Sequence, residues 1–339
     1  MRVAVFGTQD FEREFLLRAN AKSRHELVFH KESLHEGTAA MASGFPAICT
    51  FLNDRLDRAT LQRLARGGTR LVALRSAGYN NVDLGAASEF EITVMRVPAY
   101  APSAIAEHAV ALMLTLNRHI HKAYNRVREG NFDLNNLVGF NMSGKTVGII
   151  GTGKIGASLA RIMKGFGCDL LGYDVYHQPA CIEMGLQYTD LPSLLAKSDI
   201  VSIHCPLTPE TRHLINGQTI NLMKPGSMLI NTARGAIVDA NAVIDALKKN
   251  DRLTYFGMDV YEEEDRLFFS DRSSTIIEDD VFERLTTFPN VVITGHQAFL
   301  TREALTEIAE ITLGNISDFE ARNPKTDNIV RVRIASGNS

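Results

Sequence analysis

The stretch TVGIIGTGKIGASLARIMKGF (146–166) decides the fold, because three glycines join a short apolar run to an amphipathic helical run. Gly151, Gly153 and Gly156 follow the apolar run in the spacing G-x-G-x-x-G. In such a turn the first glycine permits a sharp change of direction, the second lets the backbone approach a pyrophosphate, and the third lets helix and strand pack closely. The stretch therefore predicts a strand, a phosphate-binding turn and a helix.

A carboxylate follows at the distance expected for the ribose of a dinucleotide. The next apolar run, DLLGYD, ends at Asp174, which lies 23 positions after Gly151 (174 − 151), and the expected spacing is roughly 20. A carboxylate there accepts hydrogen bonds from both ribose hydroxyls and repels a 2′-phosphate. The backbone N–H groups of Lys154 and Ile155, at the start of the helix, would bind the phosphates. We therefore expect NAD rather than NADP as the cofactor.

Short apolar runs alternate with helical stretches along the whole chain, a pattern typical of parallel sheets with helical crossovers. The runs are RVAVF, AICTF, RLVAL, TVGII, CDLLGY, IVSIHC, SMLIN, YFGMDV and NVVIT. At 339 residues the chain is long enough for two domains, each with its own core. We expect an α/β protein with two doubly wound parallel-sheet domains.

Two long helical stretches mark the expected domain boundaries. The first, AIAEHAVALMLTLNRHIHKAYNRVREG (104–130), follows VPAYAPS and is predicted to be one helix that begins near Pro102. The second, TREALTEIAEITLGNISDFEARN (301–323), follows GHQAF. If both helices carry the chain between domains, a ligand cleft would be lined by the two crossings. The predicted domains are 1–101 with 299–339, and 102–298.

The overall charge excludes some classes of partner. The formal net charge is -3 and charged residues make up 22% of the chain, so there is no basic field of the kind that nucleic-acid binding needs. The start of the chain, MRVAVFGTQDFERE, does not resemble a signal peptide, and no apolar stretch approaches the roughly 20 residues of a membrane span. We expect a cytoplasmic protein that binds neither nucleic acid nor membrane and holds a small anionic substrate with a local cation.

The four cysteines do not form a recognisable framework. Cys49, Cys168, Cys181 and Cys205 are scattered with no CxxC pair, so neither a metal site nor a set of disulfides is predicted. We interpret them as reduced thiols in the core.

Hydride transfer to a carbonyl needs a proton donor, a cation for a substrate carboxylate and a group that favours the protonated donor. Arg234, Glu264 and His296 each follow an apolar run predicted to be a strand. Because active sites of open α/β sheets gather at the carboxyl ends of strands, we expect these three side chains to lie at one edge of the sheet. Each also has an ordinary alternative: a surface arginine, a solvated acidic loop that includes Glu262 and Glu263, and a structural histidine.

Seven ordered motifs together resemble the D-isomer-specific 2-hydroxyacid dehydrogenase family. They are RSAGYNNVDL, VPAYAPSAIAEHA, GKTVGIIGTGKIG, HCPLTPETRHLIN, MKPGSMLINTARGAIVD, GMDVYEEE and TGHQAF, and they cover nearly the whole chain. The resemblance implies a central Rossmann NAD-binding domain inserted into a flavodoxin-like substrate domain, and an NAD-dependent oxidoreductase that acts on D-2-hydroxy acids.

The resemblance also implies the roles of the three strand-end side chains. Arg234 would bind the substrate carboxylate and carbonyl, and His296 would act as general acid in reduction and as general base in oxidation. Glu264 would pair with His296, because the family's acid falls five positions after the strand-end Asp259 (259 + 5); its two acidic neighbours remain alternatives. A carboxylate partner favours the imidazolium form, so that its proton is available near neutral pH.

Further contacts follow from the same resemblance. The expected cofactor-binding residues are Gly151, Gly153, Lys154, Ile155, Gly156, Asp174, Cys205, Pro206, Thr211, Thr232, Ala233 and Asp259, the last near the nicotinamide. The expected substrate-binding groups are the backbone N–H groups of Ala77 and Gly78, the hydroxyl of Tyr100, and the side chains of Arg234 and Phe299. Both domains would have to close to complete the site and exclude water.

Within the family, VPAYAP, GHQAFLT and the insertion DRLFFSDRSSTIIEDDVFERL are similar to the D-lactate dehydrogenases. Phe299 and Phe51 are candidates for closing the pocket over a methyl group, which would favour pyruvate, and plain core packing is the alternative for both. Two other functions stay open: a dehydrogenase for a bulkier 2-oxo acid, and an NADH-sensing, corepressor-like binding protein. The apolar run VALMLTLNRHIHKAYN (110–125) predicts a subunit contact, and we expect a homodimer or homotetramer.

Overall fold

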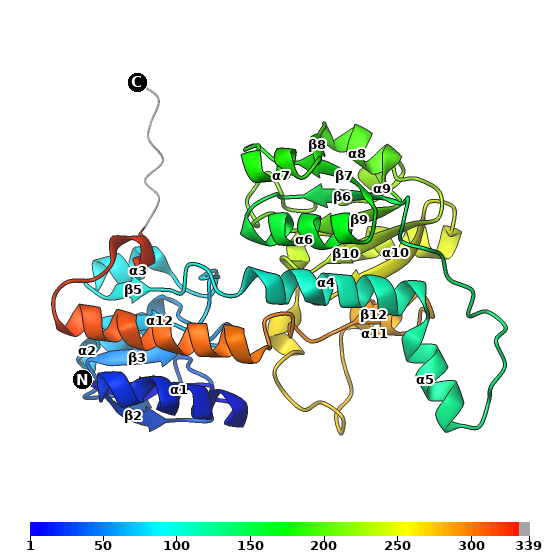
Figure 1. Ribbon diagram of the computed structural model, residues 1–339. Coiled ribbons are helices and arrows are strands. Elements are labelled where there is room, and N and C mark those ends of the chain that lie inside the picture. The colour runs from blue at the N-terminus through cyan, green and yellow to red at the C-terminus, as the bar shows by residue number, and fades with distance from the viewer. Residues whose placement is uncertain (332–339) are drawn as a thin grey trace. The chain divides into compact units, whose positions relative to one another are not determined.

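Within residues 1–331, which the computed structural model describes, every named strand belongs to one of two parallel sheets (Figure 1). The described chain divides into two compact units: Met1–Ala101 together with 300–331, and Pro102–Phe299. Each sheet carries helices on both faces, so the predicted α/β class with two doubly wound parallel sheets is confirmed.

The first unit has a five-stranded sheet in the order β2-β1-β3-β4-β5. This is the flavodoxin-like order, as the family resemblance implied. Its elements are β1 (Arg2–Val5), α1 (Asp10–Ser23), β2 (Glu26–Phe29), η1 (Ala39–Ala42), β3 (Ala47–Thr50), α2 (Arg58–Arg66), β4 (Leu71–Leu74), α3 (Leu84–Glu89), β5 (Thr93–Met95), α12 (Arg302–Glu320) and η4 (Thr326–Asn328).

Two helices cover each face of this sheet. Leu16 of α1 and Leu313 of α12 belong to one buried cluster, and Leu61 of α2 and Ala86 of α3 belong to the other. The last helix therefore returns to the first unit and packs beside α1. Because β3 and β4 are buried along their whole length, their sequences AICT and LVAL are almost continuously apolar, as central parallel strands require.

The second unit has a seven-stranded sheet in the order β12-β11-β10-β9-β6-β7-β8. Its elements are α4 (Pro102–Asn117), α5 (Ile120–Arg128), β6 (Thr146–Ile150), α6 (Lys154–Gly165), β7 (Asp169–Tyr173), α7 (Pro179–Glu183), β8 (Gln187–Tyr188), α8 (Leu191–Lys197), β9 (Ile200–Ile203), α9 (Gly217–Ile220), β10 (Ser227–Asn231), η2 (Gly235–Ile237), α10 (Ala240–Lys249), β11 (Leu253–Met258), η3 (Glu264–Arg266), α11 (Asp280–Thr286) and β12 (Val291–Ile293).

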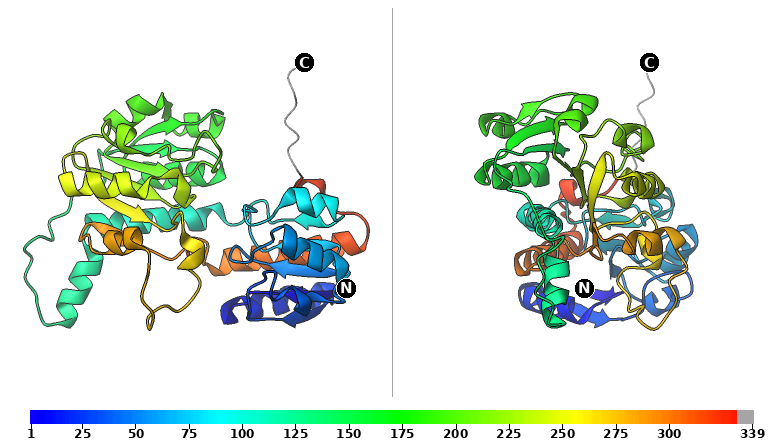
Figure 2. Two further views of the ribbon diagram at one scale, coloured as in Figure 1. Left: turned by 180° about the vertical axis from the view of Figure 1, so that it is seen from behind. Right: turned by 90° about the vertical axis from the view of Figure 1, so that its right-hand side faces the viewer.

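The strand order of the second unit changes direction at β6. From β6 the chain moves outward to β7 and β8, then returns to β9 on the other side of β6 and continues to β12. Helices α4 and α6 lie side by side on one face (Figures 1 and 2), and α8, α10 and α11 pack on the other. Ligands of open α/β sheets bind at such a switch point, outside the carboxyl ends of the strands. This topology therefore directs attention to the turns that follow β6 and β9.

The stretch 104–130 is not one helix, contrary to the expectation from sequence. Helix α4 ends at Asn117, and His119 has a left-handed backbone with φ of 51° before α5 begins. The Asn117 side chain donates to the carbonyl of Phe140 (2.8 Å) and accepts from its N–H (2.7 Å). Gly139 packs so closely that a Cβ there would lie 2.4 Å from the Asn117 carbonyl oxygen. The helix breaks because the returning chain covers this carbonyl.

No helix in the described part of the chain is both long and apolar enough to cross a membrane.

Candidate active site

The three glycines after β6 are each fixed by a different close approach. Gly151 has φ of +91°, and a Cβ on it would lie 2.4 Å from the backbone nitrogen of Cys205 in the loop after β9. A Cβ on Gly156 would lie 2.0 Å from the carbonyl oxygen of Gly151, so helix α6 packs directly on the turn. A Cβ on Gly153 would meet no atom of the described residues within 4 Å. Gly153 therefore leaves the start of α6 open, as phosphate binding to free N–H groups requires.

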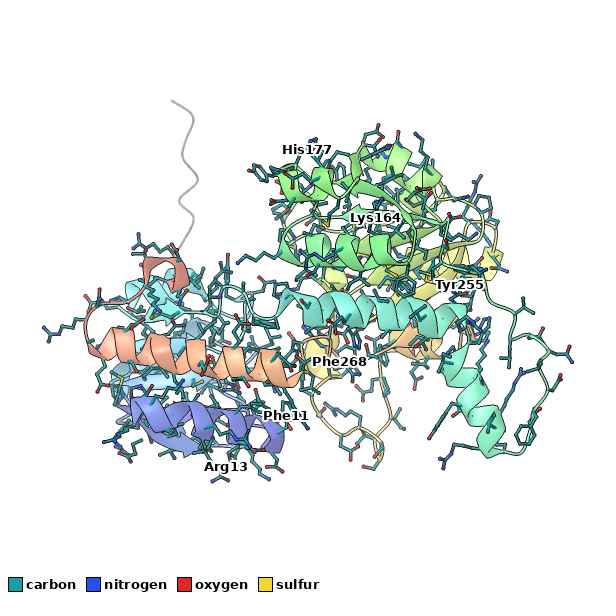
Figure 3. All side chains as sticks on the ribbon, in the orientation of Figure 1. Phe11, Arg13, Lys164, His177, Tyr255 and Phe268 are labelled. Atoms are coloured by element: carbon teal, nitrogen blue, oxygen red, sulfur yellow. The ribbon has the colours of Figure 1, made fainter. Side chains whose placement is uncertain are left out.

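Asp174 lies directly after β7, beside the glycine turn. One carboxylate oxygen accepts from the Thr152 N–H (2.6 Å) and hydroxyl (3.2 Å), and the other accepts from the N–H of Tyr176 (3.1 Å). The Thr152 hydroxyl also meets the Tyr188 hydroxyl (2.7 Å), and the Tyr188 ring stacks on His177, which Figure 3 labels, at 3.9 Å between ring centroids. The ribose-binding candidate is thus held in place by the turn that would bind the pyrophosphate.

The loop after β9 begins with two groups that burial keeps uncharged. Burial lowers the pKa of His204 to about 4, and its Nε2 meets the Ser202 hydroxyl at 2.8 Å. Burial also raises the pKa of Cys205 to about 11, so its thiol stays protonated. The four cysteines are free, in accord with the expectation of reduced thiols. Farther along, the Thr211 hydroxyl donates to the Pro206 carbonyl (2.7 Å) and so shapes the loop.

Arg234 follows β10 and keeps an unneutralised charge. Its Nη1 donates to the carbonyl of Ala233 (2.6 Å), and in its own unit no described carboxylate forms an ion pair with it. The backbone there is held by Asn231, whose side chain donates to the Arg234 carbonyl (2.9 Å) and accepts from the Ala233 N–H (3.1 Å). The Thr232 hydroxyl is buried with no hydrogen-bond partner among the described residues. The end of β10 thus offers a cation and an unsatisfied hydroxyl, both suited to a polar ligand.

The turn of residues 294–298 is built around Asp259, which has no exposed surface. Its carboxylate accepts from the Thr294 hydroxyl (2.6 Å) and from the N–H groups of Gln297 and Ala298 (both 2.9 Å), and its carbonyl accepts from the His296 N–H (2.7 Å). The structure therefore shows Asp259 holding the turn that carries His296.

A polar helix residue, His108, extends this network. Its Nε2 lies 2.9 Å from the Thr294 hydroxyl and 3.4 Å from the Asp259 carboxylate. Because the single hydroxyl proton of Thr294 goes to Asp259, His108 must donate to Thr294. Neither His108 nor Thr294 has a role predicted from sequence, although they lie within the motifs VPAYAPSAIAEHA and TGHQAF.

His296 and Glu264 form the ion pair that the resemblance implied. Nδ1 of His296 lies 2.8 Å from one Glu264 oxygen, and the other oxygen accepts from the Tyr261 N–H (2.9 Å). A carboxylate can only accept, so Nδ1 carries a proton and Nε2 is the nitrogen left for other chemistry. His296 is 9% exposed and has a left-handed φ of 52°, a conformation that is uncommon for a residue with a side chain.

The neighbouring Glu262 binds other side chains. Glu262 pairs with Arg212 and with His213, whose Nε2 lies 2.8 Å from its carboxylate. Glu262 is also next to Gly235, where a Cβ would lie 2.0 Å from the Tyr261 carbonyl carbon. This close approach ties the turn after Arg234 to the loop that carries Glu264. Glu264, and not Glu262, therefore binds His296 in this structure.

In the first unit, the loop after β4 carries Ala77 and Gly78. The Arg96 side chain donates to the Ala77 carbonyl (3.0 Å), and the Ser76 hydroxyl donates to the Gly78 carbonyl (2.7 Å). Within residues 1–331, neither Ala77 nor Gly78 uses its N–H in a hydrogen bond. Both N–H groups thus remain available for an anion.

The other residues predicted to contact substrate, Tyr100, Phe299 and Phe51, differ in burial and in the side chains around them. Tyr100 is half-buried just before α4. Phe299 is 6% exposed, and its ring centroid is 6.5 Å from that of His296. Phe51 is 7% exposed, and its ring packs against the guanidinium of Arg75. Phe51 is therefore buried and packs against a charged side chain of its own unit.

Known proteins are similar to this chain over almost its full length. Residues 110–298 match the family described as D-isomer specific 2-hydroxyacid dehydrogenase, NAD binding domain. The D-lactate dehydrogenase of Escherichia coli K12 is 51% identical over 94% of this chain and 97% of its own. Its apo-structure has a TM-score of 0.89 over 97% of this chain and 100% of that one, at 48% identity. The pyruvate reductase of Chlamydomonas reinhardtii has a TM-score of 0.91 at 43% identity, over 96% and 97%.

The family match includes the site residues that the structure brings together. A family match over more than half of the chain covers the glycine turn, Asp174 and the His296–Glu264 pair. The resemblance inferred from sequence motifs, the Rossmann unit and the NAD cofactor are thereby confirmed. The chain belongs to the D-isomer-specific 2-hydroxyacid dehydrogenase family of NAD-dependent oxidoreductases, and residues 110–298 contain its NAD-binding domain.

Proposed function

We propose that this protein catalyses the reversible, NADH-dependent reduction of pyruvate to D-lactate. The observation that carries the proposal is the His296–Glu264 pair, 2.8 Å apart, at the same sheet edge as the unneutralised Arg234. An acid and a carboxylate-binding cation are what reduction of a 2-oxo acid requires. The similarity to a D-lactate dehydrogenase and to a pyruvate reductase supports pyruvate as the substrate.

The residues around the switch point fit NAD. The open backbone at Gly153 and the N-terminus of α6, with Lys154 and Ile155, would hold the pyrophosphate, and Asp174 would accept from the ribose hydroxyls. The hydroxyl of Thr232, which is buried with no hydrogen-bond partner among residues 1–331, supplies a polar group at the end of β10, two strands from the glycine turn. When bound in reduced form, the cofactor supplies a hydride.

Arg234 would orient the substrate. Its guanidinium can donate two parallel hydrogen bonds to a carboxylate, and no described acid of its unit competes for them. We assign the N–H groups of Ala77 and Gly78 to the same carboxylate, with Tyr100 nearby. On this proposal, 1–101 with 299–339 is the substrate domain and 102–298 is the NAD-binding domain.

His296 would exchange the proton. In the imidazolium form, Glu264 accepts from Nδ1–H, so Nε2–H donates to the carbonyl oxygen as the carbonyl carbon takes the hydride. In the reverse direction, neutral Nε2 accepts the hydroxyl proton of D-lactate. The carboxylate of Glu264 accepts from Nδ1–H and so keeps the ring oriented.

A substrate panel tests the proposal. NADH oxidation by the purified protein is measured with pyruvate, 2-oxobutyrate, phenylpyruvate and hydroxypyruvate, and we expect the largest kcat/KM for pyruvate. A result in which pyruvate ranks last would contradict the lactate assignment. Binding of NADH without turnover of any 2-oxo acid would instead support an NADH-sensing protein.

Replacing Glu264 by glutamine should slow reduction. The variant keeps the shape of the side chain but loses the carboxylate that accepts from Nδ1–H of His296, so kcat should fall about tenfold or more. The matched control is Glu263→Gln, because Glu263 is an exposed neighbour outside the pair. An unchanged kcat in E264Q would exclude a role for this carboxylate in proton transfer.

Replacing Asp174 by alanine should weaken the preference for NAD over NADP. The change removes both the ribose acceptor and the charge that repels a 2′-phosphate, so the ratio of kcat/KM for NADH to that for NADPH should fall about tenfold or more. Asp169→Ala, at the exposed start of the same strand, is the control and should leave the ratio unchanged. Equal ratios in all three proteins would remove Asp174 from the ribose site.

We further propose a homodimer or homotetramer in the cytoplasm. The predicted contact in 110–125 needs adjustment, since Val110, Leu112, Met113 and Leu116 are buried in the core of their own unit. Helix α5, which projects from the end of α4 in Figures 1 and 2, instead exposes Ile120, Tyr124 and Val127 on one face. A second copy of the chain would cover this face, and sedimentation of a Tyr124→Asp variant as a smaller species would support this contact.

The free cysteines fit the reducing conditions expected in the cytoplasm.

A further inference from the structure

The segment after η3 places two consecutive phenylalanines in opposite surroundings. The Phe268 ring, labelled in Figure 3, packs edge-on against Phe282 of α11 at 5.9 Å between centroids and joins the core of the second unit. The Phe269 ring centroid instead lies 5.7 Å from that of His296, with 42° between the ring planes. One ring therefore anchors the segment, and the other reaches the proton-transfer residue.

The backbone conformation makes this separation possible. Phe269 has φ of +63°, in the left-handed region that bulky side chains rarely adopt. His296, the other member of the contact, has φ of 52°. Two residues with side chains in this unfavourable conformation thus face each other. Such conformations persist where surrounding contacts hold them, and they concentrate at functional sites.

Hydrogen bonds connect the start of this segment to the Glu264–His296 pair. The N–H groups of Leu267 and Phe268 donate to the Glu264 carbonyl at 2.9 and 2.8 Å, and the Glu264 side chain binds His296. At its far end, the Tyr261 hydroxyl lies within 3.0 Å of both oxygens of Asp279, the residue that caps α11. The position of Phe269 is therefore coupled to that of the Glu264–His296 pair.

A second aromatic ring beside the imidazole belongs to Phe299, which follows the turn that carries His296. Phe299 meets His296 edge-on at 6.5 Å, with 78° between the ring planes. A carbonyl that accepts a proton from Nε2 must bring its substituent within a few ångströms of the imidazole. Two phenyl rings beside the imidazole therefore form an apolar wall against which this substituent would pack.

We propose that Phe269 is a specificity-determining residue, which limits the 2-oxo acid to a small apolar substituent such as methyl. The ring occupies space beside His296 that a branched or aromatic substituent would need, and it presents an apolar surface to a methyl group. This inference rests on the proposed function. It assigns substrate selection to the insertion after η3, in addition to the predicted contribution of Phe299.

The test replaces Phe269 by glycine, because glycine adopts a positive φ without strain and the variant removes the whole side chain. The kcat/KM values for pyruvate and phenylpyruvate are measured with NADH in wild type, Phe269→Gly and Phe269→Leu. The ratio of phenylpyruvate to pyruvate should rise about tenfold or more in F269G and by a smaller factor in F269L. Thermal unfolding of each variant verifies that the fold is retained.

Phe268→Ala is the matched control, since it removes the adjacent ring that packs in the core. It should lower the unfolding temperature and raise the substrate ratio by much less than F269G does, because the Phe269 ring is still present. An unchanged ratio in folded F269G, or an equal rise in F268A, would overturn the role of Phe269 while leaving the proposed function in place. A wild-type protein that reduces no 2-oxo acid would overturn both.

Discussion

Replacing His296 by alanine is expected to lower kcat for pyruvate reduction by about 10²–10⁴-fold while NADH still binds. The loss follows from geometry: Glu264 holds Nδ1 at 2.8 Å, so Nε2 is the only ring nitrogen that can exchange a proton with substrate. The glycine turn and Asp174 are supported by bonds that do not involve His296, so cofactor affinity should stay close to wild type. Stopped-flow turnover and NADH fluorescence titration measure the two effects separately.

The left-handed backbone of His296 calls for a second variant. Alanine at φ of 52° is strained, whereas asparagine tolerates this region. His296→Asn should therefore lose turnover to a similar extent while leaving the 294–298 turn intact. Wild-type turnover in either variant would remove His296 from proton transfer, and lost NADH binding in both would indicate a structural role instead.

Replacing Arg75 by methionine is expected to destabilise the first unit by about 3–5 kcal/mol. Arg75 is 1% exposed and donates to the carboxylate of Glu12, which is 6% exposed, over 3.3 and 3.4 Å, and to the Phe6 carbonyl over 3.1 Å. The variant leaves the Glu12 carboxylate buried without its partner. Native-state hydrogen exchange of amides in β3 and β4 measures the free energy of unfolding of this unit alone.

Two further variants separate the lost partner from the lost packing. The double variant Glu12→Leu with Arg75→Met removes both charges, so it should recover most of the stability. Arg58→Met breaks a surface pair with Glu89, whose members are 58% and 54% exposed, and should change little. A double variant as unstable as R75M would show that packing, not the unpaired charge, dominates.

The glycine turn could be predicted from sequence because local backbone geometry fixes it. Gly151 needs a positive φ, and Gly156 lies against the Gly151 carbonyl, so the spacing itself carries the structure. The apolar runs predicted the central strands for a similar reason, since buried parallel strands are apolar throughout. By contrast, β8 has only two residues and β2 is partly exposed, so neither has a strong pattern.

Features that depend on distant partners could not be predicted in the same way. The break after α4 depends on Gly139 and Phe140, which return to cover Asn117. The network from His108 to Asp259 joins a helix to a strand end far along the chain, and no local sequence pattern predicts it. Phe269 reaches His296 only because its backbone is left-handed. The sequence indicated which residue types the chemistry needs, but not how the fold supports them.

The most direct test of the central claim is the stereochemistry of the product. Pyruvate and NADH are incubated with the wild-type protein, and the lactate formed is resolved by chiral chromatography. The account predicts D-lactate in amounts equal to the NADH consumed. Formation of L-lactate, or the absence of lactate while the protein still binds NADH, would contradict it.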